Sequence, residues 1–153
     1  MRVRKGFVYH IRDEYFDLVR GCGIKNIAEN GKTFPAFCCS KDHDNDLLWM
    51  VPASTKIEKY KAIAEKELCK YDHCFSVVFG YFDAREVAFL VQDTFPVLKK
   101  YILHPHTRKG KVIQVDSGLR ESIYYSFEEM MKLHKCGVKC LLTDIDKIKN
   151  FVC

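Results

Sequence analysis

The chain has 153 residues, of which 48% are hydrophobic and 29% charged, a composition typical of one globular domain rather than of a disordered or fibrous chain. No apolar run approaches the roughly 20 residues that cross a bilayer, and no signal-peptide core follows the basic N-terminus. The length and the lack of an export signal or spanning segment lead us to expect a single cytoplasmic domain over residues 1–153 that does not associate with membranes, and the formal net charge of +5 is modest.

The first half of the chain alternates between strand and helix patterns. Aromatic and β-branched residues predict a strand over Lys5–Ile11, and Arg12–Val19 follows as a short helix. Thr33–Ser40 and Leu47–Val51 are predicted to pair as a hairpin. Apolar residues at helical spacing then predict an amphipathic helix over Lys56–Tyr71, with a lysine-rich outer face.

The second half is also mixed, without a regular alternation of strand and helix. The expected elements are strands at Phe75–Phe79 and Glu86–Gln92 around a turn over Gly80–Arg85, a shorter strand at Val112–Val115, a long helix from Leu119 to His134 that stops at Gly137, and a final short helix at Asp144–Val152. This order predicts an α+β fold, in which helices pack around a strongly curved, mostly antiparallel sheet. Small barrel-like sheets of this kind have loop-lined grooves that suit an extended nucleic-acid strand.

Eight cysteines raise the alternatives of a disulfide framework or a metal site. There is no Cys-x-x-Cys pair, and Cys69, His73 and Cys74 lack an evident second pair of zinc ligands. We therefore expect free thiols that fill apolar space, and neither a metal nor another cofactor. Cys38 and Cys39 are adjacent, so one is expected to face the core and the other not.

Basic residues are concentrated in one acid-free stretch. Between Thr94 and Val115 there is no acidic residue, yet the stretch contains Lys99, Lys100, Arg108, Lys109 and Lys111, together with Phe95, Tyr101, His104 and His106. Cations that contact phosphates and rings that stack on bases are typical of a surface that binds RNA or another polyanion. A solvated loop with incidental charge is the alternative.

The corner between the strand at Leu47–Val51 and the following helix is the most informative segment. Thr55 is predicted to cap the helix and Glu58 to complete a capping box, and a helix start of this kind binds phosphate readily. Ser54 adds a second hydroxyl. Lys56 opposes the helix dipole by about 0.3–1 kcal/mol, which an anionic ligand would remove. The alternatives are that Ser54 only bonds to the backbone of the turn, that Thr55 only caps the helix and that Lys56 is one more solvated lysine.

Other residues are weaker candidates for the same chemistry. Lys32 follows an Asn-Gly turn, and a neighbouring strand end could bring it near Lys56; an exposed turn lysine is the alternative. His104 and His106 could act as acid and base, or could simply be exposed in a loop. His10 lies on a patterned segment and is expected to be structural.

These segments together resemble a known family. Pro52–Lys56, with Lys32–Phe34 upstream, resembles the toxins of type III toxin–antitoxin systems, the ToxN/AbiQ/CptN endoribonucleases. The similarity covers nearly the whole chain, is closest to the CptN branch and includes Phe7–Ile11, Tyr15, Trp49–Tyr60, Val78–Gly80, Ala88–Gln92 and Phe95–Pro96.

The resemblance implies a MazF-like core with an SH3-type barrel and added helices. It also implies a phage-defence endoribonuclease that is neutralised by a small repeated RNA, whose pseudoknots occupy the active-site groove and assemble with the toxin. The family's catalytic residues fall on Lys32, Ser54, Thr55 and Lys56. One departure is that the hydroxyl pair and the lysine are contiguous here, whereas the ToxN-type pattern has a residue between them.

These residue types favour a sequence-selective, metal-independent reaction, in which the RNA 2′-hydroxyl attacks the adjacent phosphate and leaves 2′,3′-cyclic phosphate and 5′-hydroxyl ends. The residues expected to contact the antitoxin and cellular RNAs are Tyr15, Lys59, Lys99, Lys100, His104, His106, Arg108, Lys109 and Lys111. A non-catalytic RNA-binding protein, a metal-dependent nuclease and a MazF-like toxin with a protein antitoxin are the alternatives.

Overall fold

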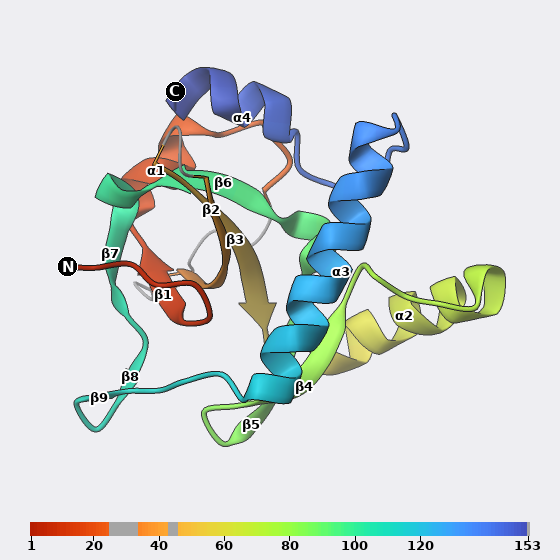
Figure 1. Ribbon diagram of the computed structural model, residues 1–153, viewed down its shortest axis with the longest axis horizontal. Coiled ribbons are helices and arrows are strands. Elements are labelled where there is room, and N and C mark those ends of the chain that lie inside the picture. The colour runs from red at the N-terminus through yellow and green to blue at the C-terminus, as the bar shows by residue number, and fades with distance from the viewer. Residues whose placement is uncertain (25–33, 43–45, 153) are drawn as a thin grey trace.

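The computed structural model describes residues 1–24, 34–42 and 46–152, with the side chains of residues 34 and 152 left aside (Figure 1). In chain order, the strands and α-helices are β1 (Val8–Ile11), α1 (Asp13–Leu18), β2 (Phe34–Asp42), β3 (Leu47–Ser54), α2 (Ile57–Tyr71), β4 (Val78–Phe82), β5 (Arg85–Phe89), β6 (Phe95–Leu98), β7 (Ile102–Pro105), β8 (Thr107–Arg108), β9 (Lys111–Val112), α3 (Ser117–Lys135) and α4 (Ile145–Val152). Short 3-10 helices, η1 (Val91–Asp93) and η2 (Lys99–Tyr101), flank β6.

A seven-stranded sheet in the order β4-β5-β3-β2-β1-β7, with β6 added beside β3, forms the centre of the fold. Every strand pairing in the described residues is antiparallel. The first half of β3 pairs with β6 and its last two residues pair with β5, so one long strand carries two partners along the same edge. The predicted α+β class and antiparallel sheet are confirmed, although the described pairings leave the sheet open rather than closed into a barrel.

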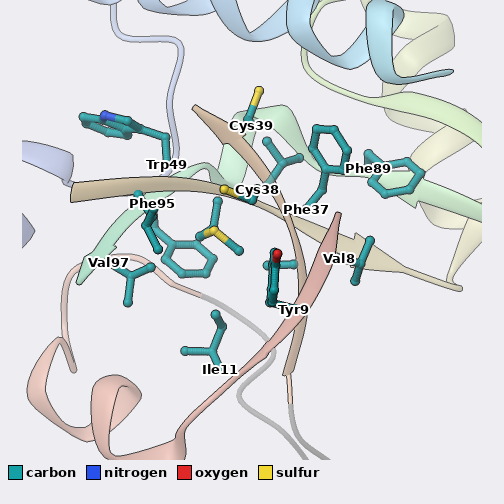
Figure 2. Close-up of a cluster of buried hydrophobic side chains, with 14 of the residues drawn as sticks. Val8, Tyr9, Ile11, Phe37, Cys38, Cys39, Trp49, Phe89, Phe95 and Val97 are labelled. Carbon is teal, nitrogen blue, oxygen red and sulfur yellow. The ribbon is translucent and has the colours of Figure 1, made fainter. Parts of the chain in front are cut away.

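Both faces of the central strands are buried, because residues alternate between two layers of core. Figure 2 shows Tyr9 and Ile11 on the same side of β1 as Phe95, and Val8 on the other side with Phe37 and Phe89. Helix α3 crosses the second face, where the rings of Phe37 and Tyr124 lie 5.7 Å apart (Figure 1). This double burial fixes the positions of the strand ends that carry the candidate site.

The two adjacent cysteines differ from expectation, because both are buried, at 0% and 1% exposure. The register of β2 against β3 shifts between Cys38 and Ser40, and both faces of β2 are covered. Burial raises the pKa of Cys38 to about 12 and raises that of Cys39 as well. These thiols are therefore protonated fillers of the core.

The β4–β5 hairpin is tighter than the sequence indicated, because β4 extends to Phe82 and β5 begins at Arg85, inside the predicted turn. Its turn consists of Asp83 and Ala84, both with positive φ, at 52° and 63°. Two consecutive residues of this kind match the twist of paired strands, which explains why β4 continues to Phe82 and β5 starts at Arg85. Gly80 of β4 allows α3 to approach, because a Cβ there would lie 2.6 Å from the side chain of Leu119.

The helices agree more closely with prediction. Helix α3 begins after Asp116, whose carboxylate accepts hydrogen bonds from the amides of Gly118 and Leu119, and Gly137 follows its end with a φ of 83°. Helix α2 buries only Tyr60 and Ala64 and extends from the sheet in Figure 1. None of the helices in the described residues is long and apolar enough to cross a membrane.

Candidate active site

The corner between β3 and α2 is an open turn. Strand β3 ends at Ser54, whose hydroxyl accepts a hydrogen bond from the Lys56 amide at 3.2 Å. The amide of Ile57 donates to the carbonyl of Thr55 at 2.9 Å. Thr55 and Lys56 are exposed, and Ser54 is half-buried. The corner therefore presents two hydroxyls and one ammonium group on three consecutive residues.

The predicted cap at this corner is wrong. Lys56, not Thr55, occupies the N-cap position of α2, and no side chain makes a capping hydrogen bond. The capping box from Thr55 to Glu58 is therefore not formed. Because the first amides of a helix have no partner within the helix, the start of α2 keeps donors that a bound phosphate would satisfy.

Sheet register brings two histidines to the same end of the sheet as this corner. A continuous row of paired residues crosses four strands, from Pro52 through Ala36 and Tyr9 to Pro105. Ser54, His10 and His104 all lie beyond this row in the same direction, because neighbouring strands are antiparallel. At a strand spacing of about 4.8 Å, β1 lies roughly 10 Å from β3. The corner and the histidines thus border one end of the sheet.

His10, His104 and His106 form a cluster with Asp83, which we call the histidine cluster. His10 Nε2 lies 2.8 Å from His106 Nδ1, and His106 Nε2 lies 2.9 Å from Asp83 Oδ2. The ring centroids of His10 and His104 are 4.8 Å apart. Arg108 approaches the other oxygen of Asp83 at 3.6 Å. We expected His10 to be only structural, and the sequence did not single out Asp83, yet both residues belong to this cluster.

The remaining basic candidates are at the surface. Those exposed to solvent are Lys59 on α2, Lys99 and Lys100 in η2, and Arg108, Lys109 and Lys111 on the β8–β9 hairpin. In Figure 1 this hairpin projects from the sheet on the side of the N-terminal strand. The stretch between Thr94 and Val115 has no acidic residue of its own, but the fold brings Asp83 of the β4–β5 turn into an ion pair with Arg108.

Of the two other predicted site residues, one is buried and the other is not among the residues that the structure describes. Tyr15 is 0% exposed, its hydroxyl donates to the carbonyl of Pro96 at 2.6 Å, and burial raises its pKa. Its ring is packed in the core and does not face a ligand, so we assign Tyr15 to the core. Lys32 lies outside the described residues, and its place in the site stays a prediction.

No described cysteine and no described cluster of metal ligands is part of the β3–α2 corner. In the described ranges, no group of three or more histidine, cysteine, aspartate or glutamate side chains is arranged to hold a metal ion. The described cysteines are free thiols, of which Cys69 and Cys136 are exposed.

Comparison with known proteins gives one relevant finding. No family model matches the chain, and no curated protein sequence matches it significantly. A solved structure described as that of AbiQ, a lactococcal anti-phage endoribonuclease belonging to the type III toxin–antitoxin system, superposes with a TM-score of 0.68. The match covers 94% of this chain and 93% of AbiQ, at 16% sequence identity. The chain therefore has the fold of AbiQ, which confirms the resemblance at the level of the fold.

Proposed function

We propose that this protein is an endoribonuclease toxin of a type III toxin–antitoxin system, with its active site at the β3–α2 corner. The observation that carries the proposal is the Ser54-Thr55-Lys56 sequence, with Thr55 and Lys56 exposed, at an uncapped helix start in a fold shared with an anti-phage endoribonuclease. Donors and a cation at one corner suit a phosphate whose negative charge increases during reaction.

The proposed reaction is attack of an RNA 2′-hydroxyl on the adjacent phosphate. The 2′-oxygen bonds to phosphorus, the bond to the 5′-oxygen breaks, and the products are a 2′,3′-cyclic phosphate and a 5′-hydroxyl. Lys56 stabilises the charge on the phosphorane, and the hydroxyls of Ser54 and Thr55 donate hydrogen bonds to its oxygens. The reaction needs no metal, because the cation at the corner is the lysine itself.

Lys32 remains a predicted member of this site. Strand β2 begins at Phe34, at the same end of the sheet as Ser54, because Ala36 pairs with Pro52. Two residues of extended chain span about 7 Å, so Lys32 is within reach of the corner by chain length alone. It acts as a base only if neighbouring cations lower its pKa, and otherwise as a further electrostatic donor.

The partner that fits this system is a small repeated RNA antitoxin with pseudoknots, which would occupy the site and assemble with the toxin in the cytoplasm. The exposed cations Lys59, Lys99, Lys100, Lys109 and Lys111 supply a surface for its phosphates and for those of cellular RNA. Tandem short repeats in the DNA upstream of the coding sequence would support an RNA antitoxin. An adjacent small protein gene without repeats would favour a protein antitoxin.

The test is cleavage of a long RNA of mixed sequence by the purified protein in the presence of a chelator. The proposal predicts a limited set of fragments with 2′,3′-cyclic phosphate and 5′-hydroxyl ends. RNA that is bound but stays intact would contradict it and favour an RNA-binding protein without activity. Cleavage that requires a divalent cation would contradict the proposed metal-independent reaction.

A further inference from the structure

The histidine cluster is more ordered than a set of exposed loop histidines. His10 comes from β1, His104 from β7 and His106 from the single residue between β7 and β8, and they meet the β4–β5 turn at Asp83. The side chain of His106 is 23% exposed and that of Asp83 27%. The ring of Phe82 lies 5.3 Å from that of His106 and closes one side.

Hydrogen-bond chemistry fixes the direction of the chain of contacts inside the cluster. An ionised carboxylate can only accept, so Asp83 takes the hydrogen on His106 Nε2. In neutral His106 the Nδ1 atom is then the acceptor, and the hydrogen of the 2.8 Å contact belongs to His10 Nε2. Asp83 thereby sets the tautomer of His106, and through it that of His10.

His104 has its own constraint. Its Nδ1 lies 2.9 Å from the backbone carbonyl of Pro105. A carbonyl oxygen has no hydrogen to give, so Nδ1 carries the hydrogen and neutral His104 has its lone pair on Nε2. The residue is exposed, and its ring leans on that of His10 at 4.8 Å. Exposed His104 thus has a basic Nε2 atom in a fixed tautomer, next to the hydrogen-bonded side chains of His10, His106 and Asp83.

We propose that His104 is the general base of RNA cleavage, with Asp83, His106 and His10 as positioning residues; the inference rests on the proposed endoribonuclease activity. His104 Nε2 accepts the proton of the 2′-hydroxyl while the 2′-oxygen bonds to phosphorus. The bond from phosphorus to the 5′-oxygen breaks, and the leaving oxygen takes a proton from Lys56 or from water. His104 then gives its proton to solvent, and the group that protonated the leaving oxygen takes one back from solvent.

The placement of His104 fits this role. Strands β3 and β7 are three strand spacings apart, about 14 Å in a flat sheet, and the sheet is curved (Figure 1). Because both faces of β2 and β1 are buried, a nucleotide held by Lys56 and His104 would lie along this end of the sheet and not across its strands. The arrangement leaves the phosphate to Lys56 and the ribose to His104.

The titratable and charged groups that face His104 and its supporting side chains are His10, His106, Asp83 and Arg108.

The test compares the single-turnover cleavage rate of the full-length protein and a His104→Gln variant on a long mixed-sequence RNA. The expected loss is about 10²–10⁴-fold, the usual contribution of a general base. Affinity for the same RNA with 2′-O-methyl groups, which cannot be cleaved, should stay within about threefold. The matched control is His73→Gln, at the far end of α2, which should cleave at the wild-type rate.

A second variant separates positioning from mere structure. Asp83→Asn should lower the rate by about tenfold, and adding it to His104→Gln should cause no further loss, because Asp83 acts through His104. The acidic limb of the pH–rate profile should disappear in His104→Gln and persist in the control.

Three results would overturn the inference. They are wild-type cleavage by His104→Gln, losses in the two variants that multiply, and a loss explained wholly by weaker binding to the methylated RNA. In each case cleavage by the wild-type protein, abolished in Lys56→Ala, would leave the proposed function standing. Absence of cleavage by the wild-type protein would instead contradict both.

Discussion

The β3–α2 corner and the histidine cluster border the same end of the sheet but differ in organisation. Within the described residues, the side chains of Ser54, Thr55 and Lys56 make one hydrogen bond, in which the Lys56 amide donates to the Ser54 hydroxyl, and the ammonium group of Lys56 makes no ion pair. In the cluster, the rings are tied to one another and to Asp83. The corner thus leaves its charge for a ligand, whereas the cluster is organised before a ligand arrives.

The largest expected effect is at the corner. Lys56→Ala should lower the rate of RNA cleavage about 10²–10³-fold, because it removes the charge that faces the phosphorane. Its stability to denaturant should change by less than about 0.5 kcal/mol, since the side chain is exposed. Lys66→Ala, on the same helix, is the matched control. Undiminished cleavage by Lys56→Ala would remove this lysine from the reaction.

The histidine cluster should respond in stability as well as in rate. His106→Gln breaks contacts on both ring nitrogens in a half-buried setting, so we expect unfolding to become about 1–2 kcal/mol easier. Urea denaturation of this variant beside Lys56→Ala measures the contrast directly. Equal stability of the two variants would mean that the cluster is no better organised than the corner.

Tyr15 tests the line between core and surface. Tyr15→Phe should destabilise the protein by about 1–2 kcal/mol, because the carbonyl of Pro96 loses its buried partner. RNA affinity and the cleavage rate should be unchanged at a temperature where the variant is folded. A folded Tyr15→Phe protein with weakened RNA binding would return this residue to the binding surface.

Alkaline pH should act on the core rather than on either region. Because burial raises the pKa of Cys38 from 9.0 to about 12, the folded state keeps a proton that the unfolded state loses. The stabilisation is complete below pH 9 and is lost as pH rises towards 12. Cys38→Ala should reduce this slope in urea denaturation, and Lys56→Ala should not. An unchanged slope in Cys38→Ala would exclude that thiol as the source.

The smallest effect is expected at the β8–β9 hairpin. If Lys109 contacts one phosphate, Lys109→Ala should reduce the slope of log affinity against log salt by about 0.7. Arg108→Ala should reduce the slope and also lower the cleavage rate, because Arg108 contacts Asp83 in the cluster. Filter binding over a salt series, with the cleavage rate measured alongside, distinguishes the two. If both variants lowered the salt slope equally and left the cleavage rate unchanged, Arg108 would not act on cleavage through the histidine cluster.

Local signals predicted more of the fold than of the site. Helical spacing located α2 and α3, because residues that share a helix face lie within a few positions of each other, whereas the strand before α2 extends to Ser54, beyond its predicted end at Val51. The cluster depends on the pairing of Tyr9 with Pro105, which no short window of sequence reveals. The turn at Asp83–Ala84 lacks the glycine that usually marks positive φ.

The cap at α2 was mispredicted for a related reason. Thr55 has the residue type of a cap, but the chain continues through the turn that Ser54 closes, and Lys56 takes the position. The departure from capping rules agrees with a corner that holds a ligand, since sites of function often break local preferences.

The central claim is that the 2′-hydroxyl of the RNA is the nucleophile, and one substitution in the substrate tests it most directly. After the cleavage position in an RNA has been mapped, the single 2′-hydroxyl that precedes the scissile phosphate is replaced by a 2′-O-methyl group. We predict that the wild-type protein still binds this RNA and no longer cuts it at that position. Cleavage there at an undiminished rate would contradict the reaction proposed for Ser54, Thr55 and Lys56.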